Sequence, residues 1–458
     1  MRVGTTNIKS FRSSPYRVDP SYHLSEGVKV RKQLSLCPYG LSTLKDGCER
    51  IFLGNIFSRV FVRDSMHGIP YLSASDTVLS DLETGRFLSK NQAADLAYLI
   101  LDRDWILVTC SGTLGNVSYT NDVFKGRIAT HDLIRIVPNN QTFLKGYLYA
   151  FLSGRYGYYQ LTQSQFGGVV KHINADQAGA IVVPCLPDSF QKEVDALVLD
   201  SASLRDAADK MLKEAVSILQ ENIKIGVSGI KKKIAYSNNK EIVASLQHRL
   251  DPPALINDGV NAMKYVRNNL NYKVMRDIRL RVYRPGIFKR SYVSDGYPYI
   301  KGSEIFERNP FLRCVYVSRT KTPFVDEMLL REGQILVTCA GSVGSIKLIT
   351  KEYENKGAIG SQDIIRIESG DDLFTKEYLF AYLKLPFVQD YIQSMKYGAV
   401  IERIEPFHVE SIPVVTPTKE ISTLITAKIK GYMQYSYEAF IKEEKAQMLV
   451  EAEIEKWK

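Results

Sequence analysis

The chain has 458 residues, a formal net charge of +10 at pH 7, and 45% hydrophobic residues. This length exceeds what one hydrophobic core usually serves, so at least two domains are expected. The positive charge favours a polyanionic partner, of which nucleic acid is the commonest, although a mildly basic protein without such a partner fits equally well. Neither an apolar signal segment near the N-terminus nor an apolar run of membrane-spanning length is found, so a cytoplasmic protein with no membrane association is predicted.

The sequence contains one 12-residue window twice. Ile106–Val117, ILVTCSGTLGNV, returns 229 positions later as Ile335–Ile346, ILVTCAGSVGSI. Other segments match in the same order at offsets from 228 to 232: Arg17–Pro20 with Arg249–Pro252, Gly68–Leu72 with Gly296–Ile300, His131–Ile136 with Gln362–Ile367, and Tyr147–Leu152 with Tyr378–Leu383. The chain is therefore predicted to be two diverged copies of one unit of about 230 residues.

Each copy is predicted to consist of a mixed α/β domain and a long helix, which makes the fold class α+β. The predicted boundaries are residues 1–187 for the first mixed domain, 188–230 for the first helix, 231–417 for the second mixed domain and 418–458 for the second helix. Glycines, three lysines and a Ser-Asn-Asn stretch near Gly226–Asn239 mark the junction between the copies.

Within the first mixed domain, the apolar run Ile106–Cys110 predicts a buried strand that is closed by a turn at Gly112 and Gly115. The later predicted elements are a strand at Leu133–Val137, a helix at Lys145–Leu161 and a strand at Ile181–Val183. A phosphate-cradling loop is the alternative at Gly112–Gly115, but neither GxxxxGK[ST] nor GxGxxG is present, so a tight turn is favoured.

The first long helix carries apolar or small residues at steps of three and four from Val194 to Ile225, including Ser201 and Asn222, which is typical of a heptad seam. The seam of the second helix is interrupted by Ser436, Glu443 and Glu453. We expect the two helices to pack on each other as an antiparallel coiled coil. The alternative is that each packs on its own domain.

Catalytic and metal-binding patterns are missing from the sequence. The six cysteines form no CxxC pair and the six histidines do not pair at helical spacing, so no metal site is predicted. Asp251–Ala254, DPPA, resembles the [DN]PP[YF] motif of DNA amino-methyltransferases, but alanine replaces the aromatic residue and no cofactor loop precedes it. The chain is predicted to be non-catalytic and to hold no cofactor.

Signals for nucleic acid are stronger. The tract Lys264–Arg290 holds nine basic residues against one acid, with Arg276, Arg279 and Arg281 at its centre, and could neutralise phosphates; a solvated charged face is the alternative. A polar segment also precedes the last strand of each mixed domain. We expect DNA contacts from these side chains: Gln163, Gln165, Lys171 and His172 in the first copy, and Lys396, Tyr397 and Arg403 in the second. Loop drift between copies is the alternative.

Taken together, the ordered and duplicated motifs resemble the specificity (S) subunit of type I restriction-modification enzymes. The resemblance covers residues 10–458 and rests on the Arg-x-Asp-Pro starts, the Gly-x-Pro-Tyr segments, the strand-turn windows and the terminal helices. It implies two target-recognition domains, each reading one half of a split double-stranded DNA site. It also implies that the paired helices form a spacer and a docking surface.

The resemblance further implies partner subunits that perform the chemistry. Two methyltransferase (M) subunits would carry S-adenosylmethionine, and restriction (R) subunits would supply the nuclease that depends on ATP and Mg²⁺. The alternatives are the recognition part or relic of a fused methyltransferase-nuclease, or a coiled-coil scaffold that binds no DNA. The absence of catalytic motifs disfavours the first alternative, and the basic tract disfavours the second.

Overall fold

The computed structural model describes residues 20–163, 171–225, 242 and 249–457. The chain divides into two compact units: unit 1 is Met1–Asp206 with Glu438–Lys458, and unit 2 is Ala207–Tyr437. Each unit therefore contains one mixed domain and a part of each long helix. Within the described ranges, no helix combines the length and the apolar character needed to cross a membrane.

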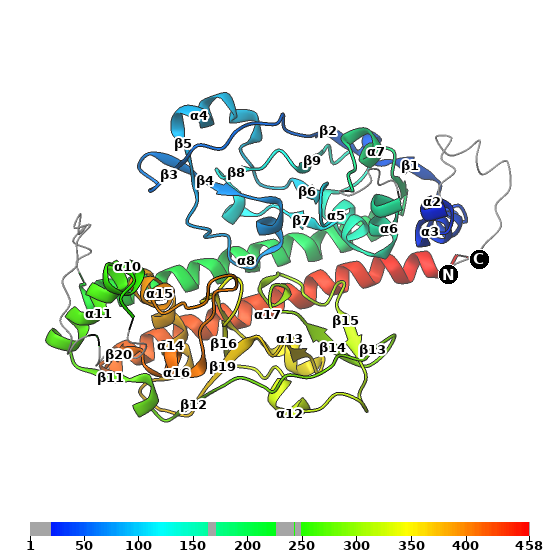
Figure 1. Ribbon diagram of the computed structural model, residues 1–458. Coiled ribbons are helices and arrows are strands. Elements are labelled where there is room, and N and C mark those ends of the chain that lie inside the picture. The colour runs from blue at the N-terminus through cyan, green and yellow to red at the C-terminus, as the bar shows by residue number, and fades with distance from the viewer. Residues whose placement is uncertain (1–19, 164–170, 226–241, 243–248, 458) are drawn as a thin grey trace. The chain divides into compact units, whose positions relative to one another are not determined.

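The described part of unit 1 forms a two-stranded sheet β1-β10 and two four-stranded sheets with the orders β2-β9-β6-β7 and β3-β5-β4-β8. The strands are β1 (Leu41–Thr43), β2 (Cys48–Phe52), β3 (Phe61–Val62), β4 (Gly68–Leu72), β5 (Phe87–Ser89), β6 (Ile106–Thr109), β7 (Val117–Tyr119), β8 (Ile128–Ala129), β9 (Leu133–Pro138) and β10 (Val182–Pro184), of which β1 to β9 are labelled in Figure 1 in blue to cyan. The helices of its mixed domain are α2 (Pro20–His23), α3 (Glu26–Leu34), α4 (Lys90–Asp95), α5 (Lys145–Ser153), α6 (Arg155–Gln163) and α7 (Ala175–Gly179). Short 3-10 turns are η1 (Leu44–Gly47), η2 (Ala74–Val78), η3 (Ala97–Leu99) and η4 (Asp122–Phe124).

Unit 2 repeats this topology, with a two-stranded sheet β11-β20 and four-stranded sheets β12-β19-β16-β17 and β13-β15-β14-β18. Its strands are β11 (Tyr272–Val274), β12 (Leu280–Tyr283), β13 (Tyr292–Val293), β14 (Tyr297–Ile300), β15 (Val315–Val317), β16 (Ile335–Thr338), β17 (Ile346–Leu348), β18 (Ile359–Gly360), β19 (Ile364–Ser369) and β20 (Pro413–Val415). Its helices are α10 (Pro252–Leu255), α11 (Asp258–Asn269), α12 (Val325–Met328), α13 (Lys351–Asn355), α14 (Lys376–Leu383), α15 (Pro386–Ser394) and α16 (Pro406–Glu410), with 3-10 turns η5 (Met275–Asp277) and η6 (Glu304–Phe306). The matching strand orders confirm the duplication predicted from sequence.

The repeated apolar window forms the central hairpin of the larger sheet in each unit. All four residues of β6 are buried, and so are all four of β16. Ile106 and Val108 face one apolar cluster while Leu107 belongs to another, because successive side chains of a strand point to opposite faces. A strand covered on both faces needs a continuous apolar run, which explains the pattern ILVT.

The prediction of a single helix at Lys145–Leu161 is wrong in one respect. This segment forms two helices, α5 and α6, which are separated at Gly154. Gly154 leaves the helical conformation, with φ −73° and ψ 177°. The chain then packs tightly, since a Cβ added to Gly157 would lie 2.3 Å from Leu152 Cα. In unit 2 the break falls at Leu385, immediately before Pro386 at the start of α15. A proline at that position favours a new helix start.

The two long helices are α8 (Asp188–Ile223) and α17 (Lys419–Glu455). In unit 1, Ser201 Oγ donates to Ala439 O at 2.8 Å and Lys442 pairs with Asp200 at 3.0 Å. In unit 2, Lys428 pairs with Glu214 at 2.5 Å. The helices therefore contact each other, with residue numbers that rise along one helix as they fall along the other, which confirms the antiparallel pairing.

The predicted heptad seam of α8 is only partly right. Asn222 is exposed, whereas Val198, Ala202 and Leu219, which lie off the predicted seam, are buried. These side chains join the apolar clusters that also contain residues of the mixed domains. The helices pack on each other and on the domains at once, so the buried stripe is wider than a two-helix seam.

Candidate nucleic-acid interface

The glycine turn after the central strand has the same hydrogen bonds in both units. In unit 1, Thr109 Oγ1 donates to Thr113 O at 2.5 Å and accepts from Asn116 N at 3.0 Å, while Gly115 N donates to Thr109 O at 2.9 Å. In unit 2 the threonine at position 338 makes the corresponding three bonds. One threonine therefore ties each turn, which the sequence pattern did not reveal.

The turn needs glycine for its backbone conformation. Gly112 has φ +69° and Gly341 has φ +73°, in the region that residues with a side chain rarely adopt. A Cβ added to either residue would meet nothing within 4 Å. The glycines are therefore required by the backbone angle, and the space beside each one is open.

The polar segments predicted to contact DNA run alongside these turns. Ser111 forms an isolated bridge with His172, and Ile173 N donates to Cys110 O at 3.1 Å. In unit 2, Ala340 bridges Arg403, and Ile404 N donates to Cys339 O at 3.0 Å. His172 and Arg403 thus occupy equivalent positions, each beside the first residue of a glycine turn.

In unit 2 the segment is a small hairpin. Tyr397 and Arg403 exchange two backbone hydrogen bonds, of 3.0 and 2.8 Å. Lys396 pairs with Glu402 at 2.5 Å, and Tyr397 OH donates to Glu405 Oε1 at 3.0 Å. The guanidinium of Arg403 makes no hydrogen bond or ion pair with any described residue, so it is the available cation of this hairpin.

In unit 1 the predicted residues fall into three groups. Lys171 and His172 are half-buried beside the turn, and Lys171 makes no ion pair with a described residue. Gln163 is 4% exposed at the end of α6, and its Nε2 donates to Tyr22 O at 3.3 Å. A base contact by Gln163 would require this buried side chain to leave its site. Gln165 lies outside the described residues.

The basic tract of unit 2 places its arginines on one edge strand and the turn before it. Arg276 lies in η5, Arg279 precedes β12 and Arg281 is within it; all three are exposed. The Arg281 guanidinium lies 4.0 Å from the centroid of the Tyr283 ring. Further along, Arg284 lies 3.6 Å from Glu405 and within 4.0 Å of Cys339 Sγ, close to the glycine turn.

The Arg-x-Asp-Pro motif has a structural role in unit 2. Arg249 pairs with Asp251, and its Nη1 donates to Ser394 O at 3.0 Å and to Lys396 O. The motif therefore holds the end of α15 where the polar hairpin begins. The equivalent residues of the first copy, Arg17 and Asp19, lie outside the described residues.

Sequence reasoning did not find an arginine–tyrosine hydrogen bond that occurs in both units. Ile56–Arg59, IFSR, and Ile287–Arg290, IFKR, are equivalent at an offset of 231. The Nε atom of Arg59 donates to Tyr71 OH at 2.6 Å, and that of Arg290 donates to Tyr299 OH at 2.8 Å. The tyrosines belong to the Gly-x-Pro-Tyr segments that the repeat search found, so the two short motifs contact each other in the fold.

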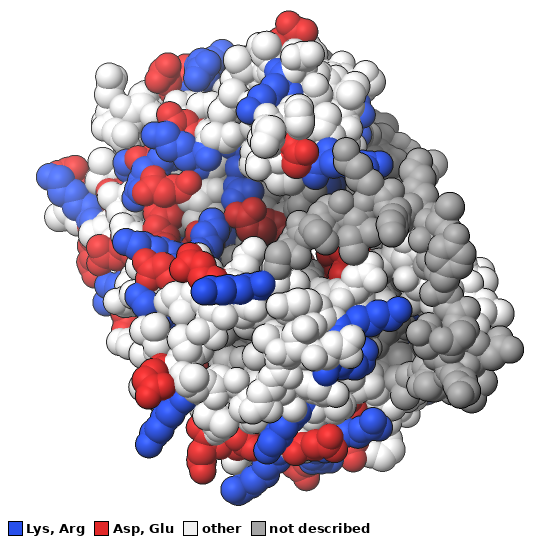
Figure 2. Space-filling model, turned by 90° about the vertical axis from the view of Figure 1, so that its left-hand side faces the viewer, with Lys and Arg blue, Asp and Glu red and all other residues white. Residues whose placement is uncertain are grey.

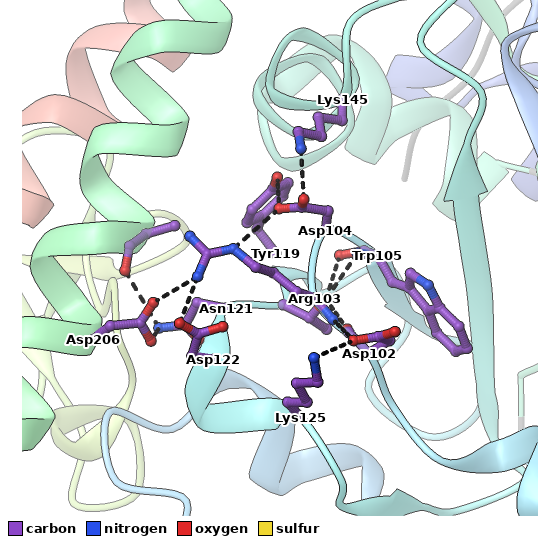
Figure 3. Close-up of polar contacts among 12 residues, drawn as sticks. Asp102, Arg103, Asp104, Trp105, Tyr119, Asn121, Asp122, Lys125, Lys145 and Asp206 are labelled. Carbon is purple, nitrogen blue, oxygen red and sulfur yellow. Dashed lines mark hydrogen bonds and ion pairs between the residues drawn. The ribbon is translucent and has the colours of Figure 1, made fainter.

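Unit 1 holds its mixed domain on α8 through charged side chains (Figure 3). Asp206 of α8 accepts from Asn121 Nδ2 at 2.7 Å and Val123 N at 3.3 Å, and lies 3.4 Å from Arg103. Arg103 also pairs with Asp122 at 2.7 Å. Burial raises the pKa of the Asp206 carboxyl. The network fixes the loops beside β7 to the long helix.

The contact at the equivalent place in unit 2 is uncharged. Tyr437 stands 231 positions after Asp206, and its hydroxyl accepts from Asn355 Nδ2 at 3.2 Å. The two copies therefore join domain to helix at matching positions with different chemistry.

The face drawn in Figure 2 carries no continuous basic patch among the described residues. There, blue Lys and Arg side chains are interspersed with red Asp and Glu side chains over the described residues.

Among the described residues no group of three or more His, Cys, Asp or Glu could hold a metal ion. Burial raises the pKa of the Cys110 thiol to about 12 and raises that of Cys339, so both thiols are neutral near pH 7.

Comparison with known proteins finds a family model that matches part of the second copy. Residues 287–446 match the family model described as the type I restriction modification DNA specificity domain. The S subunit of a type I restriction-modification system from M. genitalium is 10% identical with a TM-score of 0.32, over 90% of this chain and 95% of that one. The HsdS subunit from Thermoanaerobacter tengcongensis is 12% identical with a TM-score of 0.28, over 97% and 99%. No curated protein matches the chain.

The family match agrees with the predicted resemblance over residues 287–446. It begins at Ile287 in the IFKR segment and includes the second glycine turn, the polar hairpin and much of α17.

Proposed function

We propose that this chain, which carries a type I restriction-modification DNA specificity domain, recognises a bipartite DNA site with one half-site read by each copy. The observation that carries the proposal is the repeated placement of a variable polar segment beside a turn that both copies share. The strand orders of the two units match, so the first copy presents the same scaffold. Since side chains on that scaffold differ, the two half-sites would differ in sequence.

The side chains proposed to reach DNA lie on the polar segments beside the glycine turns and on the basic tract of unit 2. Arg403 has no carboxylate partner among the described residues, and arginine pairs in a bidentate way with guanine O6 and N7. Tyr397 and Lys396 would support Arg403 from the same hairpin, and Lys171 and His172 would act in unit 1. Arg276, Arg279 and Arg281 would bind phosphates, since their strand lies at the sheet edge.

The chain is proposed to act without catalysing a reaction itself. Methyltransferase subunits, two in number, would dock on the paired helices α8 and α17 and bring S-adenosylmethionine. Restriction subunits would bring the activity that uses ATP and Mg²⁺. The family match to a specificity domain supports this division of labour.

The test is Arg403→Ala compared with Arg403→Lys, in the full chain, over a panel of duplexes with single substitutions in the recognised site. Loss of a base contact should cost about 1–3 kcal/mol and relax one position of one half-site. Lysine keeps the charge but not the planar fork, so it should restore general affinity and not the discrimination. Unchanged discrimination in both variants would contradict the role of Arg403, and absence of DNA binding by the unmodified chain would contradict the proposed function.

A further inference from the structure

The glycine turns present matching unpaired groups in both units. The amide N–H groups of Gly112 and Thr113 have no hydrogen-bond partner among the described residues, and the same holds for Gly341 and Ser342. All four residues are exposed. Thr113 and Ser342 also carry a hydroxyl at the same position of the turn. Each turn thus offers two successive amides and one hydroxyl as donors.

Successive backbone amides in a turn with a left-handed residue form a concave site that suits an anion. The left-handed residue here is Gly112 or Gly341. A basic residue stands next to each turn: His172 bridges Ser111, and Arg403 bridges Ala340. In unit 2, Arg284 Nη1 lies 4.0 Å from the Sγ atom of Cys339, the residue before the turn. The donors of each turn, and in unit 2 the positive charges of Arg403 and Arg284, are complementary to a phosphate group.

Comparison of the turns and the polar segments between the two copies indicates which part of DNA the turns would contact. Two copies that read different half-sites should differ wherever they contact bases. The turns keep their glycines, their tying threonine and their hydroxyl, whereas the adjacent polar segments diverge. What the turns contact is therefore common to both half-sites, and the sugar-phosphate backbone is the common component.

We propose that the turns Ser111–Gly115 and Ala340–Gly344 each bind one backbone phosphate of DNA through these amides and the Thr113 or Ser342 hydroxyl. This inference rests on the proposed function. In this proposal the turns position the DNA backbone, and the polar segments beside them read the base sequence. In each unit the backbone bridge would fix the distance between the bound phosphate and the base-reading side chain.

The test places a negative charge on each turn. Thr113→Glu and Ser342→Glu change exposed side chains, and Thr113→Gln and Ser342→Gln are the uncharged controls. Thr423→Glu, at an exposed site on α17, controls for the added charge alone. Affinity of the full chain for a cognate duplex and for a scrambled duplex is measured at several salt concentrations.

Each turn variant with glutamate should bind both duplexes about tenfold more weakly than its glutamine control, with the same factor for each sequence. The slope of log affinity against log salt should fall by about one for each phosphate lost. Glutamate variants equal to their glutamine controls, or no weaker than Thr423→Glu, would overturn the phosphate assignment while DNA binding by the unmodified chain stands. A change confined to discrimination between sequences would assign the turns to bases instead. No DNA binding by the unmodified chain would overturn both proposals.

Discussion

Arg205 of α8 and Glu443 of α17 form a buried ion pair, with Nη2 2.5 Å from Oε2 and side-chain exposures of 14% and 8%. Tyr149 of α5 donates its hydroxyl to the other carboxylate oxygen at 2.5 Å. Glu443, which interrupts the apolar seam of α17 in the sequence, therefore joins three helices of unit 1.

Removing one partner of this pair should be costly. Glu443→Ala removes the carboxylate that pairs with the largely buried Arg205 guanidinium and accepts from Tyr149, and should lower the free energy of unfolding of unit 1 by about 3–5 kcal/mol. Replacing Arg205, Glu443 and Tyr149 together with methionine, leucine and phenylalanine should recover most of that loss, because the groups of the buried pair are then removed together. Urea denaturation measures both effects.

The exposed pair Lys442–Asp200 gives the control on the same helices. Lys442→Ala should change the free energy of unfolding by less than about 1 kcal/mol, since solvent screens an exposed pair. Equal losses in Lys442→Ala and Glu443→Ala would show that burial of the ion pair has no special effect.

Asp206 should hold the first mixed domain on α8. Asp206→Ala removes acceptors for Asn121 and Val123 and the charge opposite Arg103, at a cost of about 1–3 kcal/mol. Amide hydrogen exchange should accelerate at residues 119–125. Asp209→Ala, which breaks only the i,i+4 pair with Lys213, should leave exchange in that segment unchanged. Protection that persists at residues 119–125 in Asp206→Ala would argue that apolar packing alone fixes the domain.

Unit 2 should lose stability as the pH falls below the ordinary histidine pKa. Burial lowers the pKa of His408, whose Nδ1 accepts from Glu405 N at 2.9 Å, and the charge of Arg249 lowers it further. The folded state therefore binds the proton more weakly than the unfolded state. Stability is full above about pH 6.5 and declines as the pH falls toward the lowered value.

The variant His408→Asn keeps an acceptor for the Glu405 amide and does not titrate in this range. The difference in urea midpoint between pH 7.5 and 5.5 should therefore be smaller in the variant than in the unmodified chain. The same pH dependence in both proteins would exclude His408 as its source.

The proposed spacer role of the helices can be tested by an insertion. Four residues added near Ala208, where α8 passes from unit 1 to unit 2, extend the helix by about 6 Å and rotate the remainder of α8 by roughly 40°. The expected result is a bipartite site with the same half-sites and a longer gap between them, read by profiling methylated bases in cells that carry the complex. An unchanged gap, or altered half-sites, would contradict the role.

The sequence alone was enough to find the duplication, the glycine turns and the two long helices. These features are local: a left-handed turn requires glycine, a strand covered on both faces requires a continuous apolar run, and a long helix requires uninterrupted apolar spacing. Each leaves a signal within a few residues, and the second copy repeats it. The same reasoning gave the polar segments that lie beside the turns.

Only the tertiary structure decided which polar side chains remain available. Gln163 appears in sequence in a polar segment and Glu443 on a predicted helix, yet Gln163 is buried against Tyr22 and Glu443 is paired with Arg205. The hydrogen bond from Arg59 to Tyr71 likewise joins two motifs whose bonded residues are 12 positions apart. Burial and pairing depend on which distant segments meet, so a polar residue that contacts a partner and one that is satisfied inside the protein look alike until the chain is folded.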